Sequence, residues 1–174
     1  MSIQRVVMVG FMASGKSTIG QRVAKHLGWR FNDFDKEIER REDATVAAIF
    51  RRRGEAVFRT LEGQLTRETA RLSDVVLAPG GGWIAQPGLR EQLAPGSLFV
   101  WLRVPLETSL RRARRSRNKR PLLDEADPLE TARQLYAARE PLYALSDLII
   151  DAEGKGRDQV AASIAGIVRA RQGL

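Results

Sequence analysis

Short apolar runs alternate with segments of helical period along the whole chain. The apolar runs predict strands over residues 6–9, 29–31, 75–78, 98–102 and 148–150. Three of these runs are nearly continuous in apolar residues, which is typical of strands buried on both faces of a parallel sheet. Helices are predicted between them, over residues 18–27, 36–41, 46–52, 55–71, 89–93, 106–114, 129–145 and 158–171.

This alternation predicts an α/β fold, in which a parallel sheet of about five strands lies between two layers of helices. In the first predicted helix, Ile19, Val23 and Leu27 are spaced four residues apart and fall on one face. Ligands of open parallel sheets bind beyond the carboxyl ends of the strands. Polar residues that directly follow a strand are therefore the first candidates for a functional site.

The first strand and the first helix are joined by residues 10–17, whose sequence GFMASGKS matches the pattern G-x-x-x-x-G-K-[ST] without a mismatch. Backbone N–H groups of such a loop cradle phosphates, the lysine reaches the β- and γ-phosphates, and the serine hydroxyl helps to hold Mg²⁺. The following helix directs its N-terminus at the same phosphates. The segment therefore predicts a nucleoside triphosphate site that contains Lys16 and Ser17.

Composition narrows the class of protein. A chain of 174 residues with 43% hydrophobic residues fits one domain with a real core. No run reaches the ~18 apolar residues of a membrane span, and the N-terminus lacks the pattern of a secretory signal. Cysteine is absent, so thiolate chemistry is excluded and a metal would take oxygen ligands, which suits Mg²⁺. We expect a cytoplasmic protein without a membrane partner.

The positive charge is concentrated in one segment. The net charge is +8, and seven of the ten residues from Arg111 to Arg120 are Lys or Arg. A nucleic-acid surface is one interpretation, but this segment has no interleaved aromatic residues to stack on bases. A flap that closes over a triphosphate and brings arginines to the transferring phosphoryl group fits better. We therefore expect no nucleic-acid partner.

Two carboxylates, Asp33 and Asp35, follow the second predicted strand. If the segment is extended, both point to the same side. Two neighbouring carboxylates are costly unless a cation or a substrate hydroxyl lies between them. Asp35 also fits the N-cap of the next helix, so a metal-facing Asp33 and a capping Asp35 are compatible interpretations.

Three further features fit a small anionic substrate. Arg59 and Glu62 are three residues apart on a predicted helix and can pair, and an arginine held in this way presents a fork to a carboxylate. A plain surface ion pair is the alternative. Residues 80–82 are three glycines at a strand end, where the backbone can approach a ligand closely. Arg139 lies just before Pro141, near a predicted bend.

Six segments in this order, GFMASGKSTIG, DFDKEIE, GEAVFRTLE, APGGG, RPLL and REPLY, closely resemble those of shikimate kinases over roughly residues 6–150. These enzymes have the nucleoside-monophosphate-kinase-like P-loop fold, and they transfer the γ-phosphoryl group of ATP to the 3-hydroxyl of shikimate with Mg²⁺. The resemblance implies one domain over residues 1–174, with a substrate-binding region at 33–62 and a lid at 112–125. We expect it to act as a monomer on shikimate and ATP.

The resemblance also implies a role for each matching residue. The catalytic residues would be Lys16, Asp35 and Arg120. Phosphates would be held by Ala13, Ser14, Gly15, Lys16, Ser17, Thr18, Arg112 and Arg120, with Arg112 favoured over Arg114 as the second lid arginine. Magnesium would be held by Ser17 and Asp33. The substrate would be bound by Asp35, Arg59, Gly80, Gly81, Gly82 and Arg139, with both arginines on its carboxylate and Asp35 facing the attacking hydroxyl.

Two other functions remain open. A related kinase of the same fold, such as a gluconate kinase, would keep Lys16 and Ser17 but is not expected to combine Asp35 with Arg59 and Arg139. A metabolite-sensing domain without turnover would be expected to lose Lys16 or one of the two aspartates, and this chain has all three.

Overall fold

One parallel sheet organises the molecule. The computed structural model describes residues 2–115 and 127–173. The strands are β1 (Arg5–Val9), β2 (Arg30–Asp33), β3 (Val75–Ala78), β4 (Ser97–Arg103) and β5 (Leu148–Asp151). They lie in the order β2-β3-β1-β4-β5, and every neighbouring pair is parallel. All five predicted strands are present, so the predicted α/β fold with a parallel sheet is confirmed.

Helices connect the strands. They are α1 (Lys16–Leu27), α2 (Phe34–Glu42), α3 (Val46–Arg53), α4 (Glu55–Thr69), α5 (Leu89–Leu93), α6 (Leu106–Arg115), α7 (Pro128–Tyr143) and α8 (Arg157–Gln172). Each predicted helix is present, with ends that differ by one or two residues. A short 3₁₀ helix, η1 (Trp83–Ala85), follows the three glycines and was not predicted. Helix α7 contains Pro141 and ends two residues later, at Tyr143.

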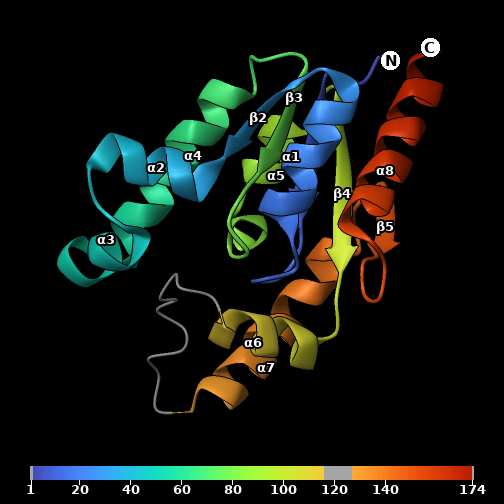
Figure 1. Ribbon diagram of the computed structural model, residues 1–174. Helices are drawn as coiled ribbons and strands as arrows, with labels where there is room; N and C mark the ends of the chain where they lie inside the picture. The colour runs from blue at the N-terminus through green and yellow to red at the C-terminus, as the bar shows by residue number, and fades with distance from the viewer. Residues whose placement is uncertain (1, 116–126, 174) are drawn as a thin grey trace.

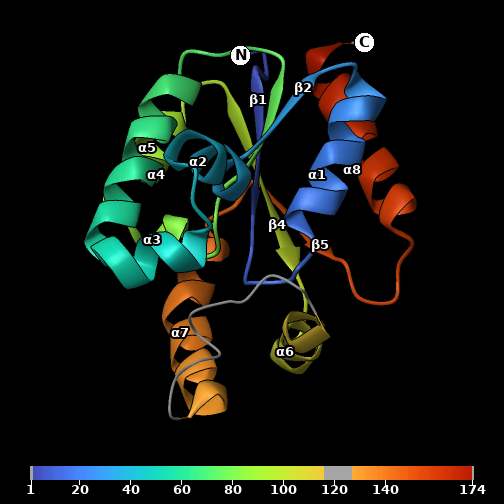
Figure 2. The same ribbon diagram turned by 60° about the vertical axis from the view of Figure 1, so that its left-hand side comes forward.

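The two faces of the sheet have separate cores, as the layers in Figures 1 and 2 show. Helices α1 and α8 cover one face, and α2 to α5 lie on the other. Because side chains alternate along a strand, each strand contributes to both cores. The α1–α8 side contains Val6, Met8, Val76, Val100, Val23 and Ile164. The α4–α5 side contains Val7, Leu77, Phe99, Leu65 and Leu93.

The strands run toward α6 and α7, which lie beyond the carboxyl end of β4, while both termini lie at the opposite end of the molecule (Figure 1). The loops after β1, β2 and β3 therefore meet at one edge of the sheet. This is the edge at which parallel sheets bind ligands.

The connection from β2 to α2 differs from the prediction in one respect. Helix α2 begins at Phe34, and its N-cap is Asp33, whose Oδ1 accepts a hydrogen bond from the Lys36 backbone N–H at 3.2 Å. Asp33 has the extended backbone that an N-cap requires (φ −95°, ψ 117°), because it is the last residue of the strand. The expectation that Asp35 caps the helix is therefore wrong, and Asp35 lies in the first helical turn.

Candidate active site

The loop after β1 has the backbone of a phosphate cradle. Gly10, Ala13 and Gly15 have positive φ angles of 146°, 53° and 102°. At Gly10 a Cβ atom would lie 2.8 Å from the carbonyl oxygen of Leu102, so no side chain fits there. Left-handed residues within such a loop turn successive N–H groups to the same side, which makes a concavity for anions. Gly15 is also the N-cap of α1, so the positive end of the helix dipole adds to it.

Lys16 is the first residue of α1, and its side chain lies across this loop. Its Nζ donates to the carbonyl oxygens of Gly10 and Phe11 at 2.8 and 2.9 Å. These contacts hold the ammonium group beside the cradle, at the position from which a P-loop lysine reaches phosphates.

A pocket of about 470 Å³ opens at the carboxyl edge of the sheet. It gathers the loop after β1, the start of α2, the glycine loop after β3, the end of α6 and the segment between β5 and α8. Its lining residues are Ala13, Ser14, Gly15, Lys16, Ser17, Thr18, Ile19, Asp33, Asp35, Ala78, Pro79, Gly80, Gly81, Arg112, Arg115, Ala152, Lys155 and Arg157. All the predicted residues of the phosphate loop and both aspartates therefore share one pocket.

The donor set at the loop suits magnesium. Ser17 offers a hydroxyl and Asp33 a carboxylate on the same pocket wall, and oxygen atoms of this kind are the ligands that Mg²⁺ prefers. Among residues 2–115 and 127–173, no group of three or more His, Cys, Asp or Glu side chains could hold a metal by itself. A magnesium ion bound together with a triphosphate needs no such group, because phosphate oxygens and waters complete its shell.

The three glycines after β3 are closely packed, since a Cβ atom on any of them would come within 3.3 Å of a neighbouring atom. At Gly80, a Cβ atom would lie 3.0 Å from Glu62 Oε1 and 3.2 Å from Asp35 Oδ1. At Gly82, a Cβ atom would lie 2.6 Å from Arg59 Nη2. At Gly81, it would lie 3.3 Å from the backbone nitrogen of Met12 in the phosphate loop. The glycine loop thus lies in close contact with both the phosphate loop and helix α4.

Arg59 is held by two carboxylates from its own helix. Its Nη1 is 2.7 Å from Glu62 Oε2, and its Nη2 is 2.7 Å from Glu55 Oε1. The predicted Arg59–Glu62 pair is present, and Glu55 joins it one turn earlier. The guanidinium also lies over the rings of Phe50 and Phe58, with 6.0 and 5.6 Å from its Cζ to the ring centroids. Its orientation is therefore fixed on several sides.

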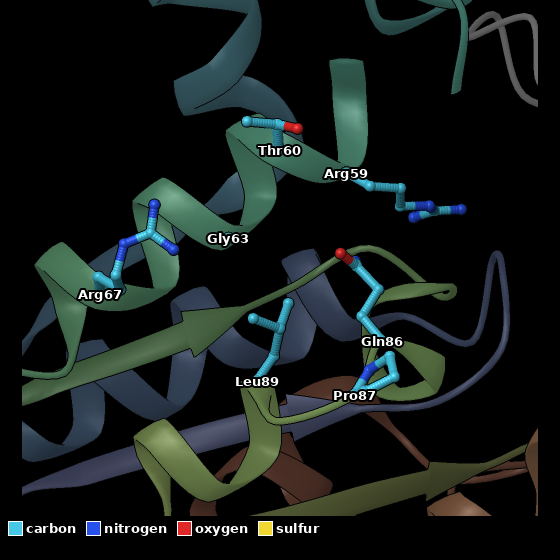
Figure 3. Close-up of a pocket in the computed structure, with 7 residues that line it drawn as sticks. All are labelled: Arg59, Thr60, Gly63, Arg67, Gln86, Pro87 and Leu89. Atoms are coloured by element: carbon cyan, nitrogen blue, oxygen red, sulfur yellow. The ribbon is translucent and has the colours of Figure 1, made fainter. Parts of the chain in front are cut away.

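Figure 3 shows a second pocket, which Arg59 lines together with other residues of α4 and with the segment after η1. Arg59 and Gln86 lie at one end of a hollow between α4 and the segment after η1, and Arg67 lies at the other end. Gln86 Nε2 donates to Glu62 Oε2 at 2.7 Å, so the segment after η1 also braces the pair.

Glu62 is the most unusual ionisable group of the site, since its side chain is 0% exposed. Burial raises its pKa to about 6, while the charge of Arg59 and its hydrogen bond act to lower it, and the charge of Asp35 adds to the rise. Within the described part of the chain, Glu62 Oε1 has no hydrogen-bond partner. For Arg59, burial acts to lower the pKa, but the Glu62 and Glu55 carboxylates outweigh it, so the pKa is raised.

The arginines of α6 and α7 occupy different positions. Arg112 lines the pocket as predicted, together with Arg115, which was not predicted, whereas Arg114 is not one of its lining residues. Arg139 lies on α7, one helical turn before Tyr143, and its charge acts to lower the pKa of that phenol. Arg120 and most of the predicted lid, 112–125, lie outside the described residues.

Comparisons with known proteins agree with this geometry. The family model described as shikimate kinase matches residues 12–169. The chain is 40% identical over 167 residues to a shikimate kinase of Thiobacillus denitrificans, with 95% of this chain and 87% of that protein covered. It is 43% identical over 152 residues to the shikimate kinase of Aromatoleum aromaticum, with 87% and 86% covered. The chain belongs to the shikimate kinase family.

Solved structures support the same assignment. A shikimate kinase from Acinetobacter baumannii in complex with shikimate superposes with a TM-score of 0.90 at 36% identity, covering 98% of this chain and 95% of that chain. A gluconokinase from Sinorhizobium meliloti gives a TM-score of 0.59 at 17% identity, with 97% and 93% covered, which shows a shared fold only. The predicted family and the P-loop kinase fold are therefore confirmed.

The sequence left several residues near the site unassigned. Lys155 and Arg157 line the pocket, in the segment where the family resemblance places a loop that contacts adenine but where no motif singles out a residue. Gln86 and Tyr143 contact the site only because η1 and α7 fold back on it. Tyr143 had one usable signal, since it lies one helical turn after Arg139.

Proposed function

We propose that this chain transfers the γ-phosphoryl group of ATP to the 3-hydroxyl of shikimate, with Mg²⁺, giving shikimate 3-phosphate and ADP. Membership in the shikimate kinase family supports an ATP-dependent kinase that acts on shikimate. The observation that carries the detailed assignment is the pocket in which the phosphate loop, Asp33, Asp35 and the glycine loop meet.

On the nucleotide side, the amides of residues 13–18 and the ammonium of Lys16 hold the phosphates. Arg112 lines the same pocket and adds positive charge where the phosphates lie. Ser17 and Asp33 would hold Mg²⁺, which would neutralise negative charge on the phosphates. Arg120 supplies the lid arginine that meets the transferred phosphoryl group. Phosphoryl transfer has a loose transition state, so positioning and charge stabilisation provide most of the catalysis.

On the acceptor side, Arg59 and Arg139 bind the carboxylate of shikimate, and the amides of the glycine loop contact the ring substituents. Asp35 orients the attacking hydroxyl and accepts its proton late in the reaction. Asp35 lies next to Gly80 and lines the phosphate pocket, so a hydroxyl bound to it faces the triphosphate. A strong base is not required, because bond formation to the incoming oxygen lags behind bond breaking.

A coupled ADP-release assay tests this proposal. Purified protein should release ADP when both shikimate and Mg²⁺ are present, and the rate should fall to background when either is omitted. Gluconate is the matched acceptor control, since it is also a polyhydroxy acid. Turnover of gluconate without turnover of shikimate would overturn the proposal in favour of the related kinase.

Each of the other proposed functions predicts a different experimental result. Tight shikimate binding without ADP release would favour a metabolite sensor, although Lys16, Asp33 and Asp35 are all present. DNA or RNA binding that depends steeply on salt and that ATP does not displace would favour a nucleic-acid surface.

Among the described residues, no helix has both the length and the apolar composition of a membrane-spanning segment.

The proposal includes a monomer that works in the cytoplasm as one domain, with its substrate region at 33–62 and its lid at 112–125. The absence of cysteine fits a reducing compartment. Size-exclusion chromatography with light scattering tests the monomer directly.

A further inference from the structure

Tyr143 connects helix α7 to the glycine loop. It is the last residue of α7 and is 1% exposed. Its hydroxyl donates a hydrogen bond to the carbonyl oxygen of Gly81 at 2.6 Å. Its ring stacks on Trp101 of β4, with 5.8 Å between ring centroids and 28° between the planes. The sheet therefore fixes the ring, and the ring directs the hydroxyl at the loop.

Arg139 lies one helical turn earlier on the same helix. Burial raises the pKa of Tyr143, while the charge of Arg139 acts in the opposite direction. The phenol thus stays protonated at physiological pH and donates to the Gly81 carbonyl. Tyr143 therefore joins the arginine-bearing end of α7 to a backbone carbonyl that is 62 residues away in sequence.

A hydrogen bond to the Gly81 carbonyl also fixes the orientation of the next peptide N–H. Because the peptide unit is planar, the direction of this C=O sets the opposite direction of the Gly82 N–H. Neither glycine has a side chain that could anchor the loop. On its other side the loop touches Arg59, since a Cβ atom on Gly82 would lie 2.6 Å from Arg59 Nη2. The loop therefore lies between Arg59, which it touches directly, and helix α7, which it reaches through Tyr143.

We propose that Tyr143 is a positioning residue of the acceptor site, which fixes the Gly81–Gly82 peptide relative to helix α7, so that this peptide and Arg139 of α7 meet the same substrate acid. The inference rests on the proposed function, because it takes shikimate as that acid. Tyr143 itself need not touch the substrate.

Tyr143→Phe tests the hydroxyl alone, because the ring and its stacking on Trp101 are kept. Removal of the hydroxyl leaves the Gly81 carbonyl without this donor. We expect KM for shikimate to rise about tenfold, the size expected from one buried hydrogen bond, with KM for ATP within about twofold of wild type. The matched control is Tyr136→Phe on the same helix, whose ring packs edge-on against Phe11 and stays in place.

The outcomes separate this inference from the proposed function. If wild-type protein does not phosphorylate shikimate, the proposed function fails. If wild type is active and Tyr143→Phe leaves KM for shikimate unchanged, the positioning role is refuted. An equal rise in both KM values would also refute it, since general damage to the fold does not discriminate between substrates.

A spectroscopic measurement avoids any dependence on how well Tyr143→Phe folds. The chain has only two tyrosines, so Tyr136→Phe leaves Tyr143 as the single site for 3-fluorotyrosine. We expect its ¹⁹F resonance to move when shikimate is added and to stay in place with ADP alone. A resonance that ignores shikimate at saturating concentration would contradict the link between the phenol and the acceptor site.

Discussion

The two edges of the sheet each hold a positioned arginine, but they hold it differently. At the amino edge, Arg5 is 3% exposed and donates to neutral oxygens, namely Ser97 Oγ at 3.0 Å and the backbone carbonyls of Leu72 and Pro95. At the carboxyl edge, Arg59 is held by two carboxylates beside a glycine loop. Arg5 joins chain segments, whereas Arg59 is the arginine that we propose for the substrate carboxylate.

Buried polar atoms without a hydrogen-bond partner show the same contrast between the two ends of the sheet. In the described part of the chain, the buried side-chain atoms without a hydrogen-bond partner are Ser14 Oγ, Asn32 Oδ1, Glu62 Oε1 and Ser109 Oγ. Ser14 lies in the phosphate loop, and Glu62 Oε1 lies beside Gly80 and Asp35. An unsatisfied buried polar group costs stability, and proteins tolerate such costs mainly at functional sites. One end of the sheet is thus closed by hydrogen bonds within the chain, whereas the other holds buried polar atoms to which no described residue bonds.

The largest expected effect comes from the carboxylate at the pocket. Asp35→Asn should lower kcat by 10²–10⁴-fold, on the order of what a positioned acid–base group contributes, with little change in thermal stability. Steady-state kinetics with saturating shikimate and ATP measure it. The matched control is Asp74→Asn in the loop before β3, an exposed residue whose left-handed backbone (φ 53°) an asparagine tolerates. Equal losses in both variants would contradict a special role for Asp35.

The two arginines on the acceptor side should act on binding. Arg59→Ala and Arg139→Ala should each raise KM for shikimate by roughly 10–100-fold, because hydrogen bonds to charged groups contribute about 1.5–3 kcal/mol. KM for ATP should change little. Arg67→Ala, two turns further along α4, is the control, since it lies at the far end of the hollow in Figure 3. If both test variants bind shikimate as tightly as wild type, the proposal that these two arginines bind the substrate carboxylate is wrong.

The amino-edge arginine should show the reverse behaviour. Arg5→Met leaves the carbonyls of Leu72 and Pro95 without their donor, and we expect the free energy of unfolding to fall by about 2–4 kcal/mol. Urea denaturation measures this loss, while KM for shikimate should stay within about twofold. Arg103→Met is the control, because its ion pair with Asp151 is exposed and its loss should have little effect on stability. A large kinetic defect in Arg5→Met would break the division between the two edges.

The smallest expected effect is a pH dependence from Glu62. Its pKa is about 6 in the folded protein against an ordinary value of 4.5, so the folded state binds more protons between these two pH values. Stability from this group is complete below pH 4.5 and is lost as pH rises through 6, by about 2 kcal/mol. Urea denaturation from pH 4.5 to 7 should show this loss in wild type and not in Glu62→Gln.

Glu55→Gln is the control for this pH dependence. Glu55 binds the same arginine, but its side chain is 62% exposed. Its variant should therefore keep the wild-type slope. If Glu62→Gln also keeps that slope, the raised pKa is not the cause.

Much of the fold was predictable because it depends on local pattern. Buried parallel strands are continuous apolar runs, so β1, β3 and β4 stand out, and even the weak β2 was located from its neighbours. The prediction of the residue that caps α2 was wrong. Both Asp33 and Asp35 suit a helix start, and the strand register, which ends β2 at Asp33, decides between them.

The site was only partly predictable. Lys16, Asp35 and Arg59 belong to short sequence motifs, so the spacing of residues within those motifs was enough to select them as candidates. Tyr143 does not, because its contact with Gly81 joins residues 62 positions apart. Nothing in the sequence around Tyr143 indicates which carbonyl its hydroxyl meets.

The succession of strands and helices, the phosphate loop and the candidate charged residues could all be read from the amino-acid pattern, because each depends on neighbours a few positions away. Which of these residues face one pocket depends on how the chain packs. Packing buried Glu62 close to Asp35, brought the glycine loop against Arg59 and set Tyr143 against the same loop. Burial and distance are properties of the packed chain, and they determine the pKa values and contacts on which the chemistry depends.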